Sequence, residues 1–189
     1  MTHMSLADFE ARYRSEGDPW GYETSDYERA KYAATLEACG PGPFRDALEL
    51  GSSIGVLSEI LAERCDRLTT IDGAPTAVAA ARRRLEGRDD VEVILGSIPE
   101  AIPAHRYDLI LASEILYYLE PDALAATLGR LRELSLFGAR LVAVHWRPEG
   151  PDRPASAAEV HRVLHAQPWL AAAGSASTDD YLLDSFTVR

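Results

Sequence analysis

The sequence has little positive charge. Of its 189 residues, 19 are Lys or Arg and 30 are Asp or Glu, which gives a formal net charge of −11. At long range such a charge repels nucleic acid and anionic membranes, so we expect neither as a partner. The densest basic cluster, three arginines at residues 82–84, is followed by acidic residues and is typical of a solvated helix face.

Cysteines, metal motifs and long apolar runs are also scarce. Cys39 and Cys65 are the only cysteines, and they lack the spacing of a metal site. His161 and His165 have the spacing of zinc ligands on a helix, but the Glu of that motif is missing, so we expect no metal. No apolar run approaches the roughly 20 residues of a membrane span, and no signal peptide is recognisable. We therefore predict a cytoplasmic protein without disulfides.

What the chain does contain is an ordinary core-forming composition, with 47% apolar and 26% charged residues, in a length that suits one domain. Periodicity and turn residues predict helices at residues 6–16, 25–38, 56–64, 75–85, 122–134 and 155–166. The same signals predict strands at residues 46–50, 68–72, 91–95, 107–112, 139–146, 173–178 and 181–188. This alternation predicts an α/β fold with a mainly parallel seven-stranded sheet, helices on both faces and a terminal antiparallel hairpin.

The stretch at residues 47–57 reads as strand, tight loop and helix, and the rest of the chain is organised around it. Gly51 and Gly55 permit positive φ angles and close approach of the backbone. The loop presents free N–H groups at the start of a helix, which suits a polar ligand lying against the backbone. It departs from the dinucleotide-binding fingerprint at Ser53, where that motif has a glycine.

A second strand ends in an acid about 20 residues after the first glycine of the loop. Asp72 closes the strand at residues 68–72, as Glu49 lies near the end of the preceding strand. In a βαβ unit, a carboxylate at this place accepts hydrogen bonds from the two hydroxyls of a ribose. Both residues can also be ordinary loop acids, but the loop, the spacing and the flanking strands together favour a nucleoside site.

With these features, the chain resembles class I S-adenosylmethionine-dependent methyltransferases over nearly its whole length. The resemblance is carried by residues 49–55, 71–72, 96–97 and 107–119. The chain is most similar to the nodulation-protein-S-like group, small bacterial enzymes that methylate amines of saccharides and related metabolites, through residues 18–22, 113–119 and 182–186. The resemblance implies a Rossmann-like domain at residues 41–189 and an N-terminal helical lid at residues 1–40, within one structural domain overall.

The resemblance also implies S-adenosyl-L-methionine as the cofactor and assigns its contacts. The methionine part is expected beside Glu49, Gly51, Ser52, Ser53 and Gly55, the ribose beside Asp72 and Gly73, the adenine beside Ser97 and Ile98, and the sulfonium near Ser113. Trp20 is expected to cover the cofactor as part of the lid, although packing of an N-terminal helix explains this side chain equally well. Arg29 or Lys31 would pair with the methionine carboxylate, unless both are solvated helix charges.

Methyl transfer from a sulfonium is an in-line displacement, so the protein mainly aligns the reactants and excludes water. An amine acceptor must be neutral to attack, and His145 is the first candidate for the base because histidine titrates near neutral pH. The alternative is a structural histidine. Glu114 is the second candidate and can also hold a cationic substrate. Tyr118, with Tyr117 and Trp146, would form an aromatic wall that attracts cations, although one of two adjacent tyrosines on a helix must face the core.

The function predicted from these residues is methyl transfer to a small molecule, with an amine of an amino sugar or related metabolite as the acceptor. Transfer to a hydroxyl remains an alternative, because His145 can deprotonate a hydroxyl as well. A NAD-dependent reductase on a similar sheet is disfavoured by the missing glycine of the loop. A non-catalytic cofactor-binding protein is the third alternative. No pattern in the sequence selects one acceptor or one oligomeric state.

Overall fold

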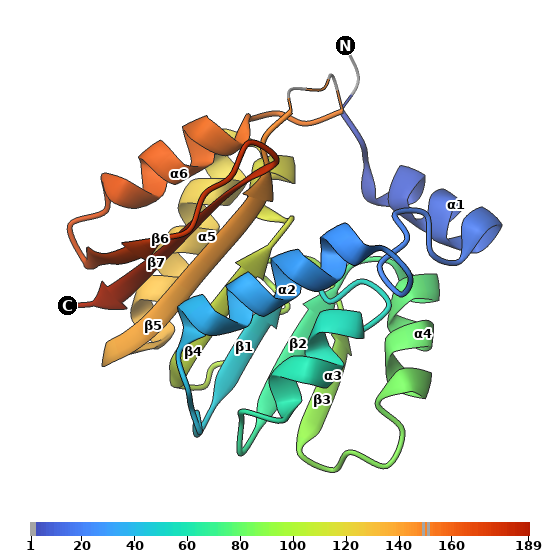
Figure 1. Cartoon of the computed structure of the whole chain (residues 1–189), viewed down its shortest axis with the longest axis horizontal. Coiled ribbons are helices and arrows are strands. Elements are labelled where there is room, and N and C mark those ends of the chain that lie inside the picture. Colours follow the sequence, from blue (N-terminus) through green and yellow to red (C-terminus); the bar gives the residue numbers. More distant parts are fainter. Residues whose placement is uncertain (1–2, 149, 151) are drawn as a thin grey trace.

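The computed structural model describes residues 3–148, 150 and 152–189, and a mixed seven-stranded sheet lies at its centre (Figure 1). The strands are β1 (Ala47–Leu50), β2 (Leu68–Asp72), β3 (Val91–Leu95), β4 (Tyr107–Ser113), β5 (Ser135–Trp146), β6 (Leu170–Ser175) and β7 (Tyr181–Val188). Their order in the sheet is β3-β2-β1-β4-β5-β7-β6. Strands β1 to β5 run parallel, and β7 runs antiparallel to its neighbours β5 and β6. The predicted α/β fold with antiparallel terminal strands is confirmed.

Local sequence signals set the ends of the helices. These are α1 (Leu6–Glu16), α2 (Asp26–Cys39), α3 (Val56–Ala62), α4 (Pro75–Arg84), the 3-10 helix η1 (Leu116–Tyr118), α5 (Pro121–Leu134) and α6 (Ala157–His165). Ser5 and Ser156 start α1 and α6 with capping boxes, and prolines start α4 and α5. Within the described residues, none of these helices combines the length and apolar character needed to cross a membrane.

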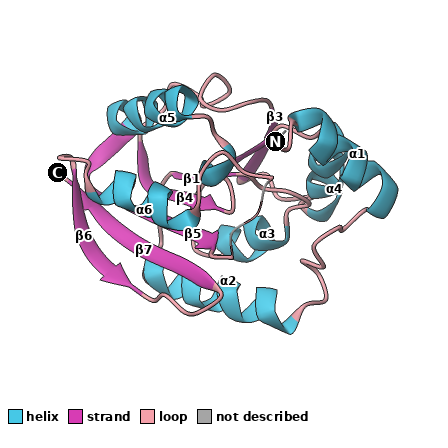
Figure 2. Ribbon diagram, turned by 90° about the horizontal axis from the view of Figure 1, so that it is seen from above, coloured by secondary structure: helices cyan, strands magenta, loops and turns pink. Residues whose placement is uncertain are grey.

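Both faces of the sheet are buried, because its central strands are apolar at nearly every position. Leu48 and Ile110 belong to the cluster that packs under α5 and α6, whereas Ala47 and Leu109 belong to the cluster under α2 and α3. The view from above shows the sheet between these two pairs of helices (Figure 2). Parallel strands that are covered on both faces need such continuous apolar runs.

The N-terminal 40 residues do not cover the sheet as one unit. Helix α2 packs against β5 and β7, with Leu36 and Cys39 in the core, and so belongs to the helices that cover one face. Helix α1 instead contacts α4 near the carboxyl ends of the strands (Figure 1). The part of the chain in the position expected for a lid is therefore α1 with the turn that follows it, which is shorter than residues 1–40.

Two strands, β5 and β6, begin several residues earlier than predicted. Strand β5 begins at Ser135 rather than residue 139, because α5 leads directly into it and Ser135 pairs with Tyr107 before the register shifts. Gly138, with φ of +80°, lies at this irregularity. Strand β6 begins at Leu170 rather than residue 173, since its buried first residue pairs with Val188 at the far end of β7.

Candidate active site

A cavity of about 560 Å³ lies at the carboxyl ends of the parallel strands, which is where open α/β sheets bind ligands. Its volume is within the range of small-molecule sites. Most residues predicted to contact the cofactor line it: Trp20, Glu49, Gly51, Ser52, Ser53, Asp72, Gly73, Ser97, Ile98 and Ser113. Glu114 and Tyr118, two of the three predicted catalytic residues, also line it. The fold thus brings nearly all of the predicted site residues to one cavity.

The loop after β1 borders the cavity with its backbone. The Gly51 N–H donates to the carbonyl of Ile71 at 2.8 Å, and Gly51 has φ of +78°. A Cβ atom at Gly51 would lie 3.1 Å from Cβ of Ile115, so the tight turn depends on glycine both for its conformation and for space. Ser53 also has a positive φ, and the hydroxyl of Ser52 is buried without a partner among the described residues.

The Asp72 carboxylate is fixed by two backbone donors. Oδ2 accepts a hydrogen bond from the N–H of Ser53 at 2.8 Å, and Oδ1 accepts one from the N–H of Ala74 at 2.9 Å. Burial raises the pKa of Asp72, and the backbone donors oppose that rise. Each oxygen retains a lone pair that can accept a hydrogen bond from a ligand hydroxyl. Asp72 therefore presents a fixed carboxylate at the cavity, at the strand end where the ribose contact is predicted.

Gly55 and Glu49, two of the residues predicted to contact the cofactor, make contacts that stabilise the protein itself. Gly55 is the N-cap of α3 with φ of +82°, and a Cβ atom there would lie 3.0 Å from Cα of Ala81 in α4. Gly55 is not among the residues that line the cavity, so its predicted cofactor contact is replaced by a role in helix packing. Glu49 does line the cavity, but its Oε2 accepts hydrogen bonds from the hydroxyls of Ser58 and Thr70. Burial raises the pKa of Glu49.

Helix α1 is tied down over the strand ends by polar contacts. The Tyr13 hydroxyl donates to Oγ of Ser53 at 2.6 Å. The Glu10 carboxylate accepts from the N–H of Thr76 at 2.9 Å and from its hydroxyl at 2.7 Å, which caps a helix start that has no side-chain cap of its own. Trp20 lines the cavity, and the centre of its ring lies 5.4 Å from that of Tyr13. The same side chain therefore packs against α1 and borders the cavity.

The cavity lining also includes a buried charged cluster of Glu28, Lys31 and Glu114. Nζ of Lys31 lies 3.0 Å from Oε1 of Glu28 and 2.8 Å from Oε1 of Glu114. Oε2 of Glu114 accepts hydrogen bonds from the Trp146 N–H at 2.9 Å and from the Tyr117 hydroxyl. Burial lowers the pKa of Lys31, but the two carboxylates outweigh burial and raise it. Glu114 is thus held by three donors: Lys31 from α2, the Trp146 N–H at the end of β5, and Tyr117 from η1. Its φ is +54°.

Of the two interpretations of Lys31, a partner of the methionine carboxylate or a solvated helix charge, the structure excludes the solvated charge. Its side chain is only 3% exposed and reaches the cavity, whereas Arg29 is exposed and pairs with Asp26. The signal in the sequence is that Lys31 falls in the apolar stripe of α2, one turn after Tyr27 and one turn before Thr35. A lysine within such a stripe has to find a buried partner.

His145 does not line the cavity and is fully buried. Its Nε2 accepts a hydrogen bond from the N–H of Leu116 at 3.2 Å, and its Nδ1 lies 3.0 Å from Nε2 of His161. Nδ1 of His161 lies 2.8 Å from the Asp184 carboxylate, so the chain of contacts continues away from the cavity. Burial holds the pKa of His145 well below its usual range. The predicted role of His145 as the base does not fit this placement, whereas the alternative of a structural histidine does.

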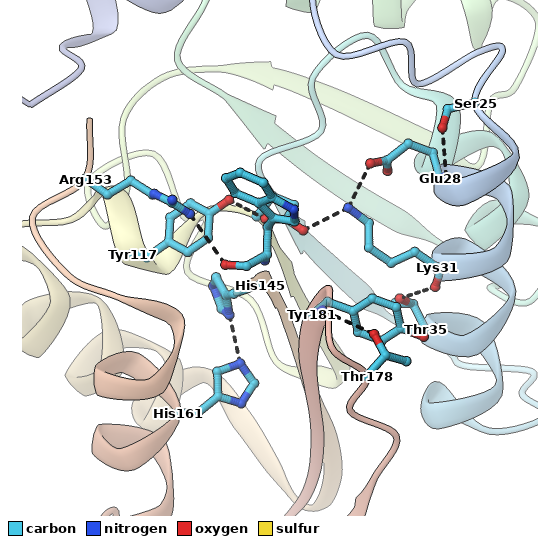
Figure 3. A network of polar contacts seen from close by, with 12 residues as sticks. Ser25, Glu28, Lys31, Thr35, Tyr117, His145, Arg153, His161, Thr178 and Tyr181 are labelled. Atoms are coloured by element: carbon cyan, nitrogen blue, oxygen red, sulfur yellow. Dashed lines mark hydrogen bonds and ion pairs between the residues drawn. The ribbon is translucent and has the colours of Figure 1, made fainter. Parts of the chain in front are cut away.

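Aromatic side chains and one arginine line the cavity as well. Tyr117, Tyr118 and Trp146 all line it, and Tyr117 is nonetheless 3% exposed, so one residue serves both the core and the cavity wall. Burial raises the pKa of Tyr118 to about 12, which keeps its hydroxyl protonated. Arg153 lies over the rings of Tyr117 and Trp146 at 4.6 and 5.1 Å. Its position in a loop gave no sequence signal. Figure 3 shows Tyr117 and Arg153 facing Glu28 and Lys31 across this part of the cavity.

Comparison with known proteins identifies the family. The sequence profile described as Nodulation protein S (NodS) matches residues 6–140. Nodulation protein S of Sinorhizobium fredii is 34% identical over 111 residues, which cover 58% of this chain and 51% of that protein. Trans-aconitate 2-methyltransferase of Rhizobium etli is 32% identical over 154 residues, covering 80% and 57% of the two chains. The chain spans about half the length of these curated relatives.

A solved structure extends the likeness to nearly the whole chain. The crystal structure of N-methyltransferase NodS from Bradyrhizobium japonicum in complex with S-adenosylhomocysteine superposes with a TM-score of 0.87. It is 25% identical in sequence, and the match covers 98% of this chain and 99% of that one. The profile match includes both the strand-end loop and the buried charged cluster, whereas Trp146, Asp152 and Arg153 of the cavity lie beyond it. This chain belongs to the nodulation protein S (NodS) family.

Proposed function

We propose that this protein transfers a methyl group from S-adenosylmethionine to the amine of a small molecule. The observation that carries the proposal is the cavity, which joins a glycine loop and a fixed Asp72 carboxylate at one end to a negatively charged, aromatic end beside Glu114. Family membership supports the same activity, since the NodS of Bradyrhizobium japonicum is an N-methyltransferase crystallised with S-adenosylhomocysteine.

The residues present fit an adenosyl cofactor. The Asp72 carboxylate would accept hydrogen bonds from the ribose hydroxyls, as its two backbone donors leave lone pairs available. The buried Ser52 hydroxyl has no protein partner among the described residues and would bond to a polar group beside the loop. Ser97 and Ile98 line the part of the cavity expected to hold adenine, and Ser113 borders the methionine part.

The cofactor would supply a methyl group already activated by the sulfonium, so the protein has to align the acceptor and keep water away. Helix α1, held by Tyr13 and Glu10, shields the cavity from solvent. Glu114 would orient the acceptor amine by charge, and Tyr118 and Trp146 would border it with aromatic faces that attract cations. Because three donors already occupy the Glu114 carboxylate, it serves better as a fixed anion than as a proton acceptor.

The charge of the lining favours an amine over an acid as the acceptor. Among the described residues, five carboxyl side chains line the cavity (Glu28, Glu49, Asp72, Glu114 and Asp152), against two cationic ones, Lys31 and Arg153. Such a lining attracts a cationic ligand and repels a polycarboxylate. An amino sugar or related metabolite meets this requirement. The net negative charge of the chain supports a small-molecule substrate rather than nucleic acid. The two free cysteines support a cytoplasmic location.

One observation favours a second candidate, methyl transfer to a carboxylate. The Arg153 guanidinium lines the cavity between two aromatic rings, and the trans-aconitate 2-methyltransferase relative is named for an acidic substrate. Within the described part of the chain, its acidic neighbour is Asp152 at 3.4 Å, and its Nη atoms donate to the carbonyls of Trp146 and Pro148. Two of the five guanidinium N–H donors then remain for an anion.

Calorimetry with S-adenosylhomocysteine and a methylation screen test the proposal together. We expect wild-type protein to bind S-adenosylhomocysteine and Asp72→Ala to bind it about 100-fold more weakly, while Asp26→Ala, at an exposed position of α2, binds normally. Mass spectrometry of products from matched amine and carboxylate panels then identifies the acceptor class. Absence of S-adenosylhomocysteine binding by the wild type, or normal binding by Asp72→Ala, would contradict the proposal; methylated acids alone would support the second candidate.

A further inference from the structure

Among the described residues, Glu28 is the member of the buried charged cluster with an oxygen that accepts no hydrogen bond of normal geometry. Its side chain is 9% exposed and lines the cavity. Oε1 accepts a hydrogen bond from Nζ of Lys31 at 3.0 Å, whereas Oε2 is buried without such a bond. The nearby Tyr32 hydroxyl lowers the pKa of Glu28 but does not offset its charge. Figure 3 shows Glu28 and Lys31 projecting from α2 toward the centre of the site. Buried polar atoms in proteins are nearly always hydrogen-bonded, so this oxygen calls for a ligand.

The charge of the cluster indicates what kind of ligand this is. Lys31 is shared between the carboxylates of Glu28 and Glu114, so two negative charges surround one positive charge. The Lys31 and Glu114 side chains are 3% and 13% exposed, and an uncompensated charge at such a depth is costly. A neutral hydroxyl could bond to Oε2 but would leave the excess negative charge in place. A cationic donor both fills the hydrogen bond and balances the charge.

The surroundings of the cluster suit a primary ammonium in particular. An aromatic ring stands beside the ammonium of Lys31, whose Nζ lies 5.2 Å from the centre of the Tyr27 ring. An ammonium is compact and carries several donors, so it can reach Oε2 and neighbouring acceptors at once. Burial raises the pKa of Glu28 while Lys31 opposes that rise, so an arriving cation strengthens the ionised form.

We propose that Oε2 of Glu28 binds the primary ammonium group of a ligand within this cavity. The inference rests on the proposed function, which supplies two sources of the ammonium group. One is the amino-acid end of the cofactor, and the other is the acceptor amine. Neither the motif loop nor the sequence analysis pointed to Glu28, because its role depends on the burial of Lys31 beside it.

The first arm of the test compares two ligands that share the adenosyl part. S-adenosylhomocysteine carries the ammonium, and methylthioadenosine lacks it. Calorimetry on wild type and Glu28→Gln gives the ratio of the two dissociation constants. If the cofactor supplies the ammonium, Glu28→Gln weakens S-adenosylhomocysteine by about tenfold or more and leaves methylthioadenosine unchanged. Retained methylthioadenosine binding also shows that the variant is folded. Glu37→Gln, at an exposed position of the same helix, is the matched control.

The second arm uses the protein saturated with S-adenosylhomocysteine and compares D-glucosamine with D-glucose, which differ in one amine. If the acceptor supplies the ammonium, wild type binds glucosamine more tightly, and Glu28→Gln loses that preference without losing affinity for S-adenosylhomocysteine. The proposal is overturned if Glu28→Gln changes neither the ratio in the first arm nor the preference in the second. If wild-type protein binds neither S-adenosylhomocysteine nor methylthioadenosine, the proposed function is contradicted instead. That result is distinct from an unchanged ratio of the two dissociation constants.

Discussion

The two ends of the cavity both contain a pair of carboxyl groups but treat their charge in different ways. At the cofactor end, Glu49 and Asp72 are held by hydroxyl and backbone N–H donors, and neither forms an ion pair within the described residues. At the end proposed to hold the acceptor (the acceptor end), Glu28 and Glu114 share the ammonium of Lys31. Neutral donors hold a carboxylate without offsetting its charge, whereas the shared ammonium offsets one of the two negative charges and ties both carboxylates to a single residue.

This difference predicts that the acceptor end is the more sensitive to loss of one charge. Lys31→Met keeps most of the side-chain length but leaves two carboxylates without their common cation, so we expect the free energy of unfolding to fall by about 3–5 kcal/mol. Urea denaturation measures the change. Arg29→Met, which breaks only the exposed pair with Asp26, is the control and should change it by less than about 1 kcal/mol. Equal effects of the two substitutions would show that the buried cluster is not ionised.

The stability of the protein is also expected to depend on pH through His145, which accepts a hydrogen bond from the backbone of η1 beside the acceptor end. Because burial lowers the folded-state pKa of His145 below its usual 6.5, the unfolded chain takes up a proton that the folded protein does not. Stability is therefore full above pH 6.5 and falls as the pH drops below it, by at most about 1.4 kcal/mol per pH unit for one proton. Urea denaturation between pH 5 and 8 should show this fall in wild type and a flatter profile in His145→Gln. Parallel profiles would exclude His145 as the source.

The cofactor end is expected to respond to pH in the opposite sense. Burial raises the pKa of Asp72 above its ordinary 3.8, so the folded state loses stability as the pH rises through the window between the unfolded and folded values. Asp72→Asn removes the titrating group but also loses one backbone hydrogen bond, because its amide nitrogen cannot accept from the N–H of Ser53 or Ala74. We therefore expect the ligand-free variant to lose the pH dependence in this window, whatever its absolute stability. The same denaturation series measures the slope, and an unchanged slope in Asp72→Asn would exclude Asp72 as its source.

The smallest effect is expected at the contact that joins α1 to the cofactor end. Tyr13→Phe removes the hydrogen bond to Ser53 and should cost about 0.5–1.5 kcal/mol of S-adenosylhomocysteine binding, with little change in global stability. Calorimetry gives the affinity, and hydrogen exchange in α1 reports whether the helix opens more often. Glu16→Gln, at an exposed position of α1 away from the cavity lining, is the matched control.

The cofactor end was predictable from the sequence because its parts are close along the chain. Asp72 bonds to Ser53 only 19 positions away, and both sit at strand ends that apolar runs and glycines mark. The acceptor end joins Lys31 to Glu114 across 83 positions, and such a pairing leaves no local pattern. The role of Gly55 was misassigned because glycine serves a helix contact and a ligand contact equally well. His145 was misassigned because only the tertiary structure shows that α6 and β7 cover it with His161 and Asp184.

The central claim is that an adenosyl ligand lies at the ends of the first two strands with its ribose on Asp72. A crystal structure of the protein with S-adenosylhomocysteine tests this most directly. The account predicts both ribose hydroxyls within hydrogen-bonding distance of the Asp72 carboxylate, and the amino-acid end along the loop after β1. An adenosyl group bound elsewhere, or an Asp72 carboxylate turned away from the ribose in the complex, would contradict it.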